Sequence, residues 1–374
     1  MLRSMYTHST AVQQRAVLAS IVGSARLRGH REAMAASNTK TEAAALAGGK
    51  HRRVYTAEHG TILPGTLVMQ EGDPASTDAA VNEAYDGAGW TYDLFWEAYE
   101  RDSLDAAGLT LDSTVHFQRD YDNAFWDGKQ MVYGDGDGEL FNRFTLALDV
   151  IGHELTHGVT QFTSNLNYSG QSGALNESYS DVFGSLVKQW QRGQPASEAD
   201  WLVGQGLFTS EVNGVALRSM KEPGTAYDDP VLGKDPQPAH MRDYVVTLED
   251  NGGVHVNSGI PNHAFFLAAV AMGGHAWERA GRIWYIAGRD RMRTNTNFQG
   301  AADLTFEVAR ALYGEGSAEQ QAVQYGWESV GITIGAQPQS QPRPSGCSIA
   351  PLTALRTLVR RSVRIQDDPR IELR

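Results

Sequence analysis

Cysteine is almost absent from this chain of 374 residues, which contains only Cys347. An intramolecular disulfide is therefore impossible, and a cysteine zinc ligand is not expected because Cys347 lies far along the chain from the cluster of histidines. The chain also lacks the roughly eighteen consecutive apolar residues that a membrane-spanning helix requires. No continuous apolar stretch follows the basic residues near the N-terminus, so an ordinary secretory signal is not evident.

Positive charge is scarce in the central part of the chain. Residues 1–53 carry nine Lys or Arg against two acids, and residues 336–374 carry seven Arg against three acids. The formal net charge of −12 therefore leaves −23 on residues 54–335. So acidic a body argues against nucleic-acid binding, which needs a basic face. The basic N-terminal segment either docks on this body or stays solvated, and the sequence leaves both open.

Composition and the pattern of apolar residues along the chain predict four regions. Residues 1–53 are a short basic propeptide-like segment that ends in a flexible linker over 48–53. Residues 54–160 form a β-rich domain that includes the metal-binding helix, and residues 161–335 form a helical domain. Residues 336–374 are a disordered linker and an Arg-rich tail by composition. Apolar periodicity predicts helices at 79–99, 142–163, 173–192, 258–273, 276–290 and 298–313.

The sequence His153-Glu154-Leu-Thr-His157 lies in a helical stretch. Histidines at positions i and i+4 project from one face of a helix, so both imidazoles can bind one ion. Glu154 follows the first histidine directly, where a base for a metal-bound water is needed. This pattern predicts a zinc site with hydrolytic chemistry.

A second helix supplies the remaining ligand of the predicted site. Glu177 lies twenty positions beyond His157, which is enough for the chain to turn and return antiparallel. Two histidines and one glutamate leave a fourth position open, the pattern of catalytic zinc. Asp181 shares a helix face with Glu177 and can accept a hydrogen bond from a ligand histidine. The alternative for this helix is a surface with two solvated carboxylates.

His255 follows a Gly-Gly pair and has Asp250 five residues before it. Such a carboxylate can hold an imidazole protonated and aimed at a developing oxyanion. A lone histidine is more often structural, so from the residues alone both interpretations stay open.

Six short motifs together resemble the thermolysin family of neutral zinc metalloproteases. They are Asn123-Ala-Phe-Trp126, Tyr133-Gly-Asp-Gly-Asp-Gly138, His153-Glu-Leu-Thr-His157, Gly173-Ala-Leu-Asn-Glu177, Leu217-Arg-Ser-Met220 and Asn251-Gly-Gly-Val-His-Val-Asn257. The resemblance covers about residues 54–335. The short N-terminal segment most resembles the protealysin-type subgroup, whose propeptide is brief.

The resemblance implies an α+β fold with two domains. The N-terminal half should be β-rich and the C-terminal half mainly helical, with the active-site cleft between them. It implies that Glu154 is the general base, that His255 and Tyr168 stabilise the oxyanion, and that Asp250 orients His255. Asn176 is expected to support the ligand histidines together with Asp181.

The resemblance also implies a set of substrate-binding residues. Asn123 and the backbone around Ala124 would bind the substrate as an added strand, and Arg218 would hold a substrate carbonyl. The expected pocket for the residue after the scissile bond consists of Phe141, Phe144, Val150 and Leu217. Because these side chains are apolar, we expect a preference for Leu, Phe or Ile at that position of the substrate. Ordinary core packing is the alternative for each of these four side chains.

Calcium is the point at which the sequence departs from the family pattern. Asp149 and Asp200 match the acids of the family's double calcium site, but Lys188, Leu202 and Gln205 stand where further acids are expected. An ammonium group in place of a carboxylate removes a ligand and repels a dication. We therefore expect one Zn²⁺ and argue against the double calcium site.

Other functions remain to be weighed against a secreted endopeptidase. A gluzincin aminopeptidase shares the zinc motif, but its Gly-x-Met-Glu-Asn type motif is not found. A non-catalytic zinc-binding protein would have lost the base, which is present as Glu154. A zymogen whose residues 1–53 act as an intramolecular propeptide is compatible with the endopeptidase and concerns only its regulation. We expect a monomer acting on proteins or peptides, secreted by resemblance, with a cytoplasmic or non-classically exported protein as the alternative.

Overall fold

The computed structural model describes residues 49–336, and its N-terminal part is built on a five-stranded sheet. The strands are β1 (Arg52–Thr56), β2 (Thr66–Gln70), β3 (Leu111–Val115), β4 (Ala124–Trp126) and β5 (Met131–Tyr133), and their order in space is β2-β1-β3-β5-β4. The central strands β1, β3 and β5 are parallel, whereas β2 and β4 are antiparallel to their neighbours. The short strand β4 therefore forms one edge of the sheet.

The sheet begins before the expected domain boundary at residue 53. Arg52 and Arg53 belong to β1, and the Arg52 guanidinium lies 3.5 Å from the centre of the Tyr85 ring. Arg52 also binds Glu71 at 2.7 Å, and Arg53 binds Asp112 at 2.7 Å. The prediction of a flexible linker over 48–53 is therefore wrong at its C-terminal end, because both arginines are paired across the sheet. Residues 1–48, the bulk of the expected N-terminal segment, lie outside the described residues.

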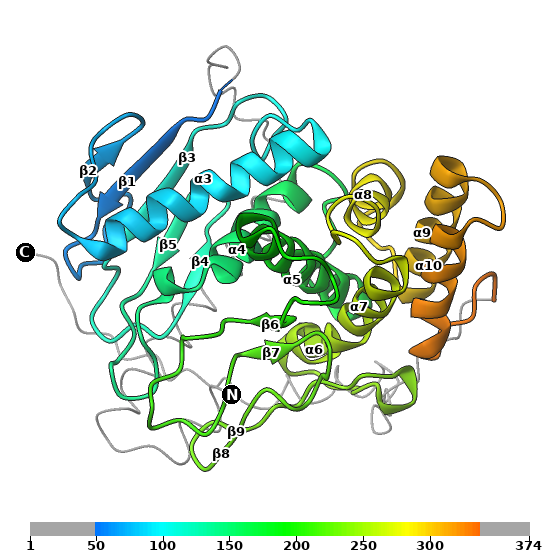
Figure 1. The fold of residues 1–374 in the computed structure, drawn as a ribbon. Coiled ribbons are helices and arrows are strands. Elements are labelled where there is room, and N and C mark those ends of the chain that lie inside the picture. The colour runs from blue at the N-terminus through cyan, green and yellow to red at the C-terminus, as the bar shows by residue number, and fades with distance from the viewer. Residues whose placement is uncertain (1–48, 337–374) are drawn as a thin grey trace, which may run out of the picture. The chain divides into compact units, whose positions relative to one another are not determined.

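Helix α3 (Ala79–Tyr99) packs on one face of this sheet, as Figure 1 shows. Its buried residues recur three and four positions apart, which gives the helix a continuous apolar face. Asp78 caps its N-terminus by accepting a hydrogen bond from the Ala80 N–H at 2.9 Å. The helix coincides with the predicted range 79–99.

Two helices in the middle of the chain, α4 (Leu148–Gln161) and α5 (Gly170–Arg192), pack directly against each other. Glycines make their close approach possible. A Cβ added at Gly152 would lie 3.0 Å from the Cα of Gly184, and one added at Gly184 would lie 2.2 Å from the Asp149 carbonyl oxygen. The expected helix 142–163 is shorter than predicted, because Ala147 is extended and separates α4 from a 3₁₀ turn at Phe144–Leu146.

The C-terminal part is mainly helical. Its helices are α6 (Asp250–Asn257), α7 (Gly259–Met272), α8 (Ala280–Ile286), α9 (Phe298–Tyr313) and α10 (Ala318–Ser329). Two short antiparallel pairs of strands precede them. In the first, β6 (Leu202–Val203) pairs with β7 (Arg218–Ser219), and in the second, β8 (Asp228–Asp229) pairs with β9 (Gly233–Lys234). The range 298–313 was predicted correctly, whereas α10 was not predicted. The expected helix 276–290 is divided into α8 and a π-helical turn at Ala287–Arg291.

The observed fold is the expected one, with strands gathered in the N-terminal half and helices in the C-terminal half (Figure 1). Residues 49–336 belong to a single compact unit, so the expected division at residues 160 and 161 is not marked by a loss of contact. Among the described helices, none combines the length and the apolar character needed to cross a bilayer. The expected tail 336–374 lies outside the described residues, except for Ala336.

Candidate metal centre

Helices α4 and α5 bring His153, His157 and Glu177 together. One potential ligand atom from each lies within 4.8 Å of the others. The His153 Nε2 atom is 3.4 Å from Glu177 Oε2, and the His157 Nε2 atom is 3.5 Å from Glu177 Oε1. All three residues are buried. The described part of the chain contains no other His, Cys, Asp and Glu group of this kind.

Both histidines are oriented for metal binding through their second ring nitrogen. His153 Nδ1 lies 2.7 Å from Asp181 Oδ1, and an ionised carboxylate can only accept, so Nδ1 carries the proton. The Asn176 amide donates to the Leu166 carbonyl, which turns its oxygen toward His157 Nδ1 at 2.8 Å. With Nδ1 held in this way, the Nε2 atom of each ring faces Glu177, and two imidazoles with one carboxylate fit a zinc ion.

Asp181 is the most heavily bound carboxylate near the site. Besides His153, it accepts hydrogen bonds from Arg218 Nε and Nη2, at 2.8 and 2.6 Å, and from Asn262 Nδ2 at 2.8 Å. Burial alone would raise the pKa of Asp181, but Arg218 and His153 outweigh burial and hold that pKa well below its usual value. Asp181 therefore stays ionised, and the positive partners offset the cost of burying its charge.

Glu154 is held by the edge strand β4. The Trp126 backbone N–H donates to Glu154 Oε2 at 3.0 Å. The Trp126 indole in turn donates to Gln161 Oε1 at 3.0 Å, one helical turn beyond the second ligand histidine. Strand β4 and the zinc-binding helix are therefore tied together at the predicted base and again about two turns beyond it.

Tyr168 and His255 lie next to the predicted ligand Glu177. The Tyr168 hydroxyl donates to Glu177 Oε1 and lies 3.1 Å from His255 Nε2. Asp250 accepts from His255 Nδ1 at 2.6 Å and from the His255 N–H at 2.8 Å. Burial lowers the pKa of His255, but the carboxylates of Glu177 and Asp250 outweigh burial and raise it above its usual value. This shift favours the protonated imidazole, which can donate a hydrogen bond from either ring nitrogen.

Among the described residues, no strand pairs with the outer edge of β4, which lies beside Glu154. The Asn123 carbonyl accepts from the Gly134 N–H, and the Asp127 N–H donates to the Gln130 carbonyl; Gly134 and Gln130 flank β5. Because successive residues of a strand direct their backbone groups to opposite sides, the groups of Ala124 point to the other edge. This is the edge from which the Trp126 N–H reaches Glu154.

Three of the four residues expected in an apolar pocket, Phe141, Phe144 and Val150, are buried, and Leu217 is partly buried. The rings of Phe141 and Phe144 stack at 5.7 Å, and Phe208 lies 5.5 Å from Phe141. Phe208 was not among the expected residues. Arg218 follows Leu217 directly and uses two of its nitrogens to bind Asp181.

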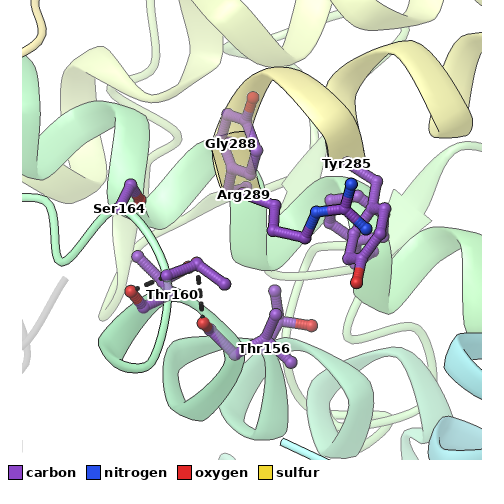
Figure 2. Close-up of a pocket in the computed structure, with 10 residues that line it drawn as sticks. Thr156, Thr160, Ser164, Tyr285, Gly288 and Arg289 are labelled. Carbon is purple, nitrogen blue, oxygen red and sulfur yellow. Dashed lines mark hydrogen bonds between the residues drawn. The ribbon is translucent and has the colours of Figure 1, made fainter. Parts of the chain in front are cut away.

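A separate small pocket lies behind the zinc-binding helix. Figure 2 shows it between Thr156 and Thr160 of α4 and the residues Tyr285, Gly288 and Arg289. None of its lining residues belongs to the predicted site.

At the expected calcium locus, a lysine provides the positive charge. Lys188 is buried, and its Nζ atom binds Asp149 Oδ2 at 2.7 Å, Asp200 Oδ1 at 2.9 Å and the Leu202 carbonyl at 2.6 Å. Burial would lower the pKa of Lys188, but Asp149 and Asp200 outweigh burial and raise it. The Lys188 ammonium therefore places a positive charge against these oxygens, and this charge repels a dication.

The structure adds residues that sequence reasoning missed. Asn262 binds Asp181, Ser180 lies 3.1 Å from His157 Nδ1, and Gln161 binds Trp126. Trp126 lies inside one of the six motifs, but no role followed from the motif. Nothing in the sequence marks Asn262, because its partner lies 81 residues away.

Comparisons with known proteins agree with this geometry. Two family models match the chain: "Thermolysin metallopeptidase, catalytic domain" over residues 23–161, and "Thermolysin metallopeptidase, alpha-helical domain" over residues 164–332.

The similar proteins are proteases by name. An extracellular metalloprotease from Pectobacterium carotovorum is 55% identical over 289 residues, which cover 77% of this chain and 83% of that protein. Thermolysin from Alicyclobacillus acidocaldarius is 39% identical over 288 residues, covering 74% of this chain and 50% of that protein. The solved precursor of protealysin from Serratia proteamaculans is 50% identical, with a TM-score of 0.81, and the match covers 89% of this chain and 97% of that one.

The Asp181 cluster yields a first prediction. In Asp181→Asn, the His153 ring loses its charged acceptor and Arg218 is left buried without a counter-charge. We expect zinc affinity to fall about 10–100-fold, measured by competition with a zinc-binding dye. Asp112→Asn, which breaks only the pair with Arg53 on the sheet, is the matched control and should bind zinc normally. Unchanged zinc affinity in the folded Asp181→Asn protein would contradict the role given to Asp181.

Proposed function

Because this chain belongs to the thermolysin family of metallopeptidases, we propose that it is an endopeptidase whose Glu154 activates the water that attacks the peptide bond. One observation carries the proposal: the two histidines and Glu177 converge on one point, and Glu154 lies beside it with its carboxylate held by β4. A non-catalytic zinc-binding protein would not need a carboxylate held at that position.

The chemistry divides between the ion and the chain. A zinc ion held by His153, His157 and Glu177 would polarise the scissile carbonyl and lower the pKa of a bound water. Glu154 would take a proton from the attacking water and pass it to the leaving amine. Its carboxylate accepts the Trp126 N–H, which fixes its direction through the reaction.

Two donors are available for the oxyanion that develops on the scissile carbonyl. Tyr168 and protonated His255 both lie next to Glu177, and Asp250 holds His255 in place. Such donors lower the barrier because their charge and dipoles are already oriented before the reaction. We assign both to oxyanion stabilisation, with Asp250 as the residue that orients His255.

The substrate would bind in an extended conformation along β4. The backbone groups of Ala124 face the outer edge of β4, where a peptide can add as a further strand. Asn123 lies beside this edge. Arg218, already anchored to Asp181, would hold a substrate carbonyl near the scissile bond.

The assigned base can be tested by Glu154→Gln. The amide cannot accept a proton but leaves the three ligands untouched. We expect zinc content equal to wild type, by atomic absorption, and loss of nearly all casein hydrolysis, at least about a thousandfold. A matched control is Glu139→Gln, an exposed acid away from the metal ligands, which should keep full turnover. Wild-type casein cleavage by Glu154→Gln would refute the assigned base.

The apolar residues Phe141, Phe144, Val150 and Leu217 support a preference for a large apolar residue after the scissile bond. Burying a Leu side chain there gains about 1.5–3 kcal/mol, so kcat/KM should be about 10–100-fold higher for Leu than for Ala at that position. Blocked peptides with an N-terminal acetyl group are the substrates to compare, because an aminopeptidase would not cleave them. Equal rates for the Leu and Ala peptides would contradict this specificity.

We propose that Lys188 replaces calcium in joining the zinc-binding helix to its surroundings. Asp149 lies in the first turn of α4, Lys188 lies near the end of α5, and Leu202 lies in β6, which pairs with the strand carrying Arg218. One ammonium group therefore links three elements that carry the proposed site.

Chelation provides the test of this proposal. The thermal midpoint of the wild-type protein should be the same in calcium and in a calcium-selective chelator. Lys188→Met leaves Asp149 buried without its counter-charge and should cost about 3–5 kcal/mol of stability, measured by urea unfolding. Arg192→Met removes only an exposed, 3.7 Å contact with Asp200 and should cost far less. A wild-type midpoint that rises with calcium would contradict the proposal.

Secretion and a role for residues 1–53 as an intramolecular propeptide remain proposals. Their support is the names of the relatives, which include an extracellular metalloprotease and a protealysin precursor, and the basic charge of this segment against an acidic body. N-terminal sequencing of the active protein tests the second proposal, since a fully active uncut chain would exclude removal of the segment. Action as a monomer is likewise proposed.

A further inference from the structure

The chain makes an unusual turn just before His255. Four consecutive residues are left-handed: Asp250, Asn251, Gly252 and Gly253 have φ values of 52°, 51°, 87° and 78°. Residues with side chains normally visit this region singly, because the Cβ approaches the following carbonyl oxygen. The glycines adopt it freely, but Asp250 and Asn251 must be held by their surroundings, and such backbone is concentrated at functional sites.

Hydrogen bonds and close packing fix this turn. The N–H groups of Gly252 and Gly253 donate to the Glu249 carbonyl at 3.0 and 2.9 Å. A Cβ at Gly252 would lie 3.1 Å from the Gly170 nitrogen, so the turn rests on the first residue of α5. The Asp250 carboxylate faces His255 and binds both its backbone and its ring.

Asn251 connects this turn to the second proposed oxyanion donor. Its Nδ2 atom donates to the Tyr168 carbonyl at 3.2 Å. The Tyr168 side chain returns to the same turn, because its hydroxyl lies 3.1 Å from His255 Nε2. Asn251, Tyr168, His255 and Asp250 therefore close a ring in which each member contacts the next.

We propose that Asn251 is a positioning residue that fixes the Tyr168 hydroxyl against His255 by holding the Tyr168 main chain. This proposal rests on the oxyanion role given to both residues above. Asparagine suits the position for two reasons. It tolerates the left-handed conformation better than most side chains, and its amide supplies the donor that glycine lacks.

Asn251→Gly tests the proposal, because glycine keeps the left-handed turn and removes only the amide. Displacing a catalytic group by less than 1 Å lowers turnover strongly. We expect kcat for a blocked peptide to fall about tenfold, with KM within about twofold and zinc content unchanged. Asn251→Asp also tolerates the turn but cannot donate to a carbonyl, so it should show the same loss.

A matched control separates this loss from the effect of glycine itself. Glu100 is also left-handed, with φ of 55°, and ends α3 on the exposed surface. Glu100→Gly should leave kcat unchanged. Wild-type kcat in both Asn251 variants would overturn the proposal.

A double-mutant cycle shows whether Asn251 acts through Tyr168. Tyr168→Phe keeps the carbonyl that Asn251 binds but lacks the hydroxyl. In that background Asn251→Gly should lower kcat by less than about twofold, because there is no hydroxyl left to misplace. An equal loss in both backgrounds would mean that Asn251 is merely structural, and would overturn the proposal. If Tyr168→Phe alone left kcat unchanged, the oxyanion role of Tyr168 would fail, whatever the Asn251 variants showed.

Discussion

The contact between α4 and α5 at Gly152 and Gly184 is the constraint on which the site depends. Neither position has room for a Cβ, so the two helix backbones touch. This contact lies beside His153 on one helix and between Glu177 and the end of α5 on the other. Wider separation would leave the three ligand side chains too far apart to share one ion. The two glycines thus determine the positions of the three proposed metal ligands.

From that contact outward, polar groups are arranged in pairs that satisfy one another. Asp181 takes hydrogen bonds from His153, Arg218 and Asn262, and therefore couples a metal ligand to a residue assigned to the substrate. Trp126 performs a comparable task on the other side, since its backbone holds Glu154 and its indole binds Gln161. A buried charge without such partners would be costly, which explains why these side chains occur as a network.

Local patterns predicted the parts of this site that local geometry governs. The pair His153 and His157 follows from the pitch of a helix, and helices at 79–99 and 298–313 follow from apolar periodicity. The interpretation of Asp181 as a partner of a ligand histidine follows from its helix face, and the structure confirms that contact.

Features that depend on distant contacts were not predictable in this way. Asn262 and Gln161 acquire their roles only when separate elements pack. Strand β1 includes Arg52 and Arg53 because pairing to Glu71 and Asp112 draws them into the sheet, although their composition is typical of a linker. For the turn at residues 250–253, the sequence indicates a left-handed conformation only at the two glycines. The left-handed conformation of Asp250 and Asn251 depends on contacts with other parts of the fold.

Lys188 has a consequence that reaches beyond stability. A bound ion obeys mass action, so its occupancy depends on its concentration in the surroundings and falls on dilution. An ammonium group carried by the chain is present in fixed stoichiometry and arrives with the fold itself. Under the proposal that Lys188 replaces calcium, the junction between α4, α5 and β6 needs no mineral ion from the medium at this locus.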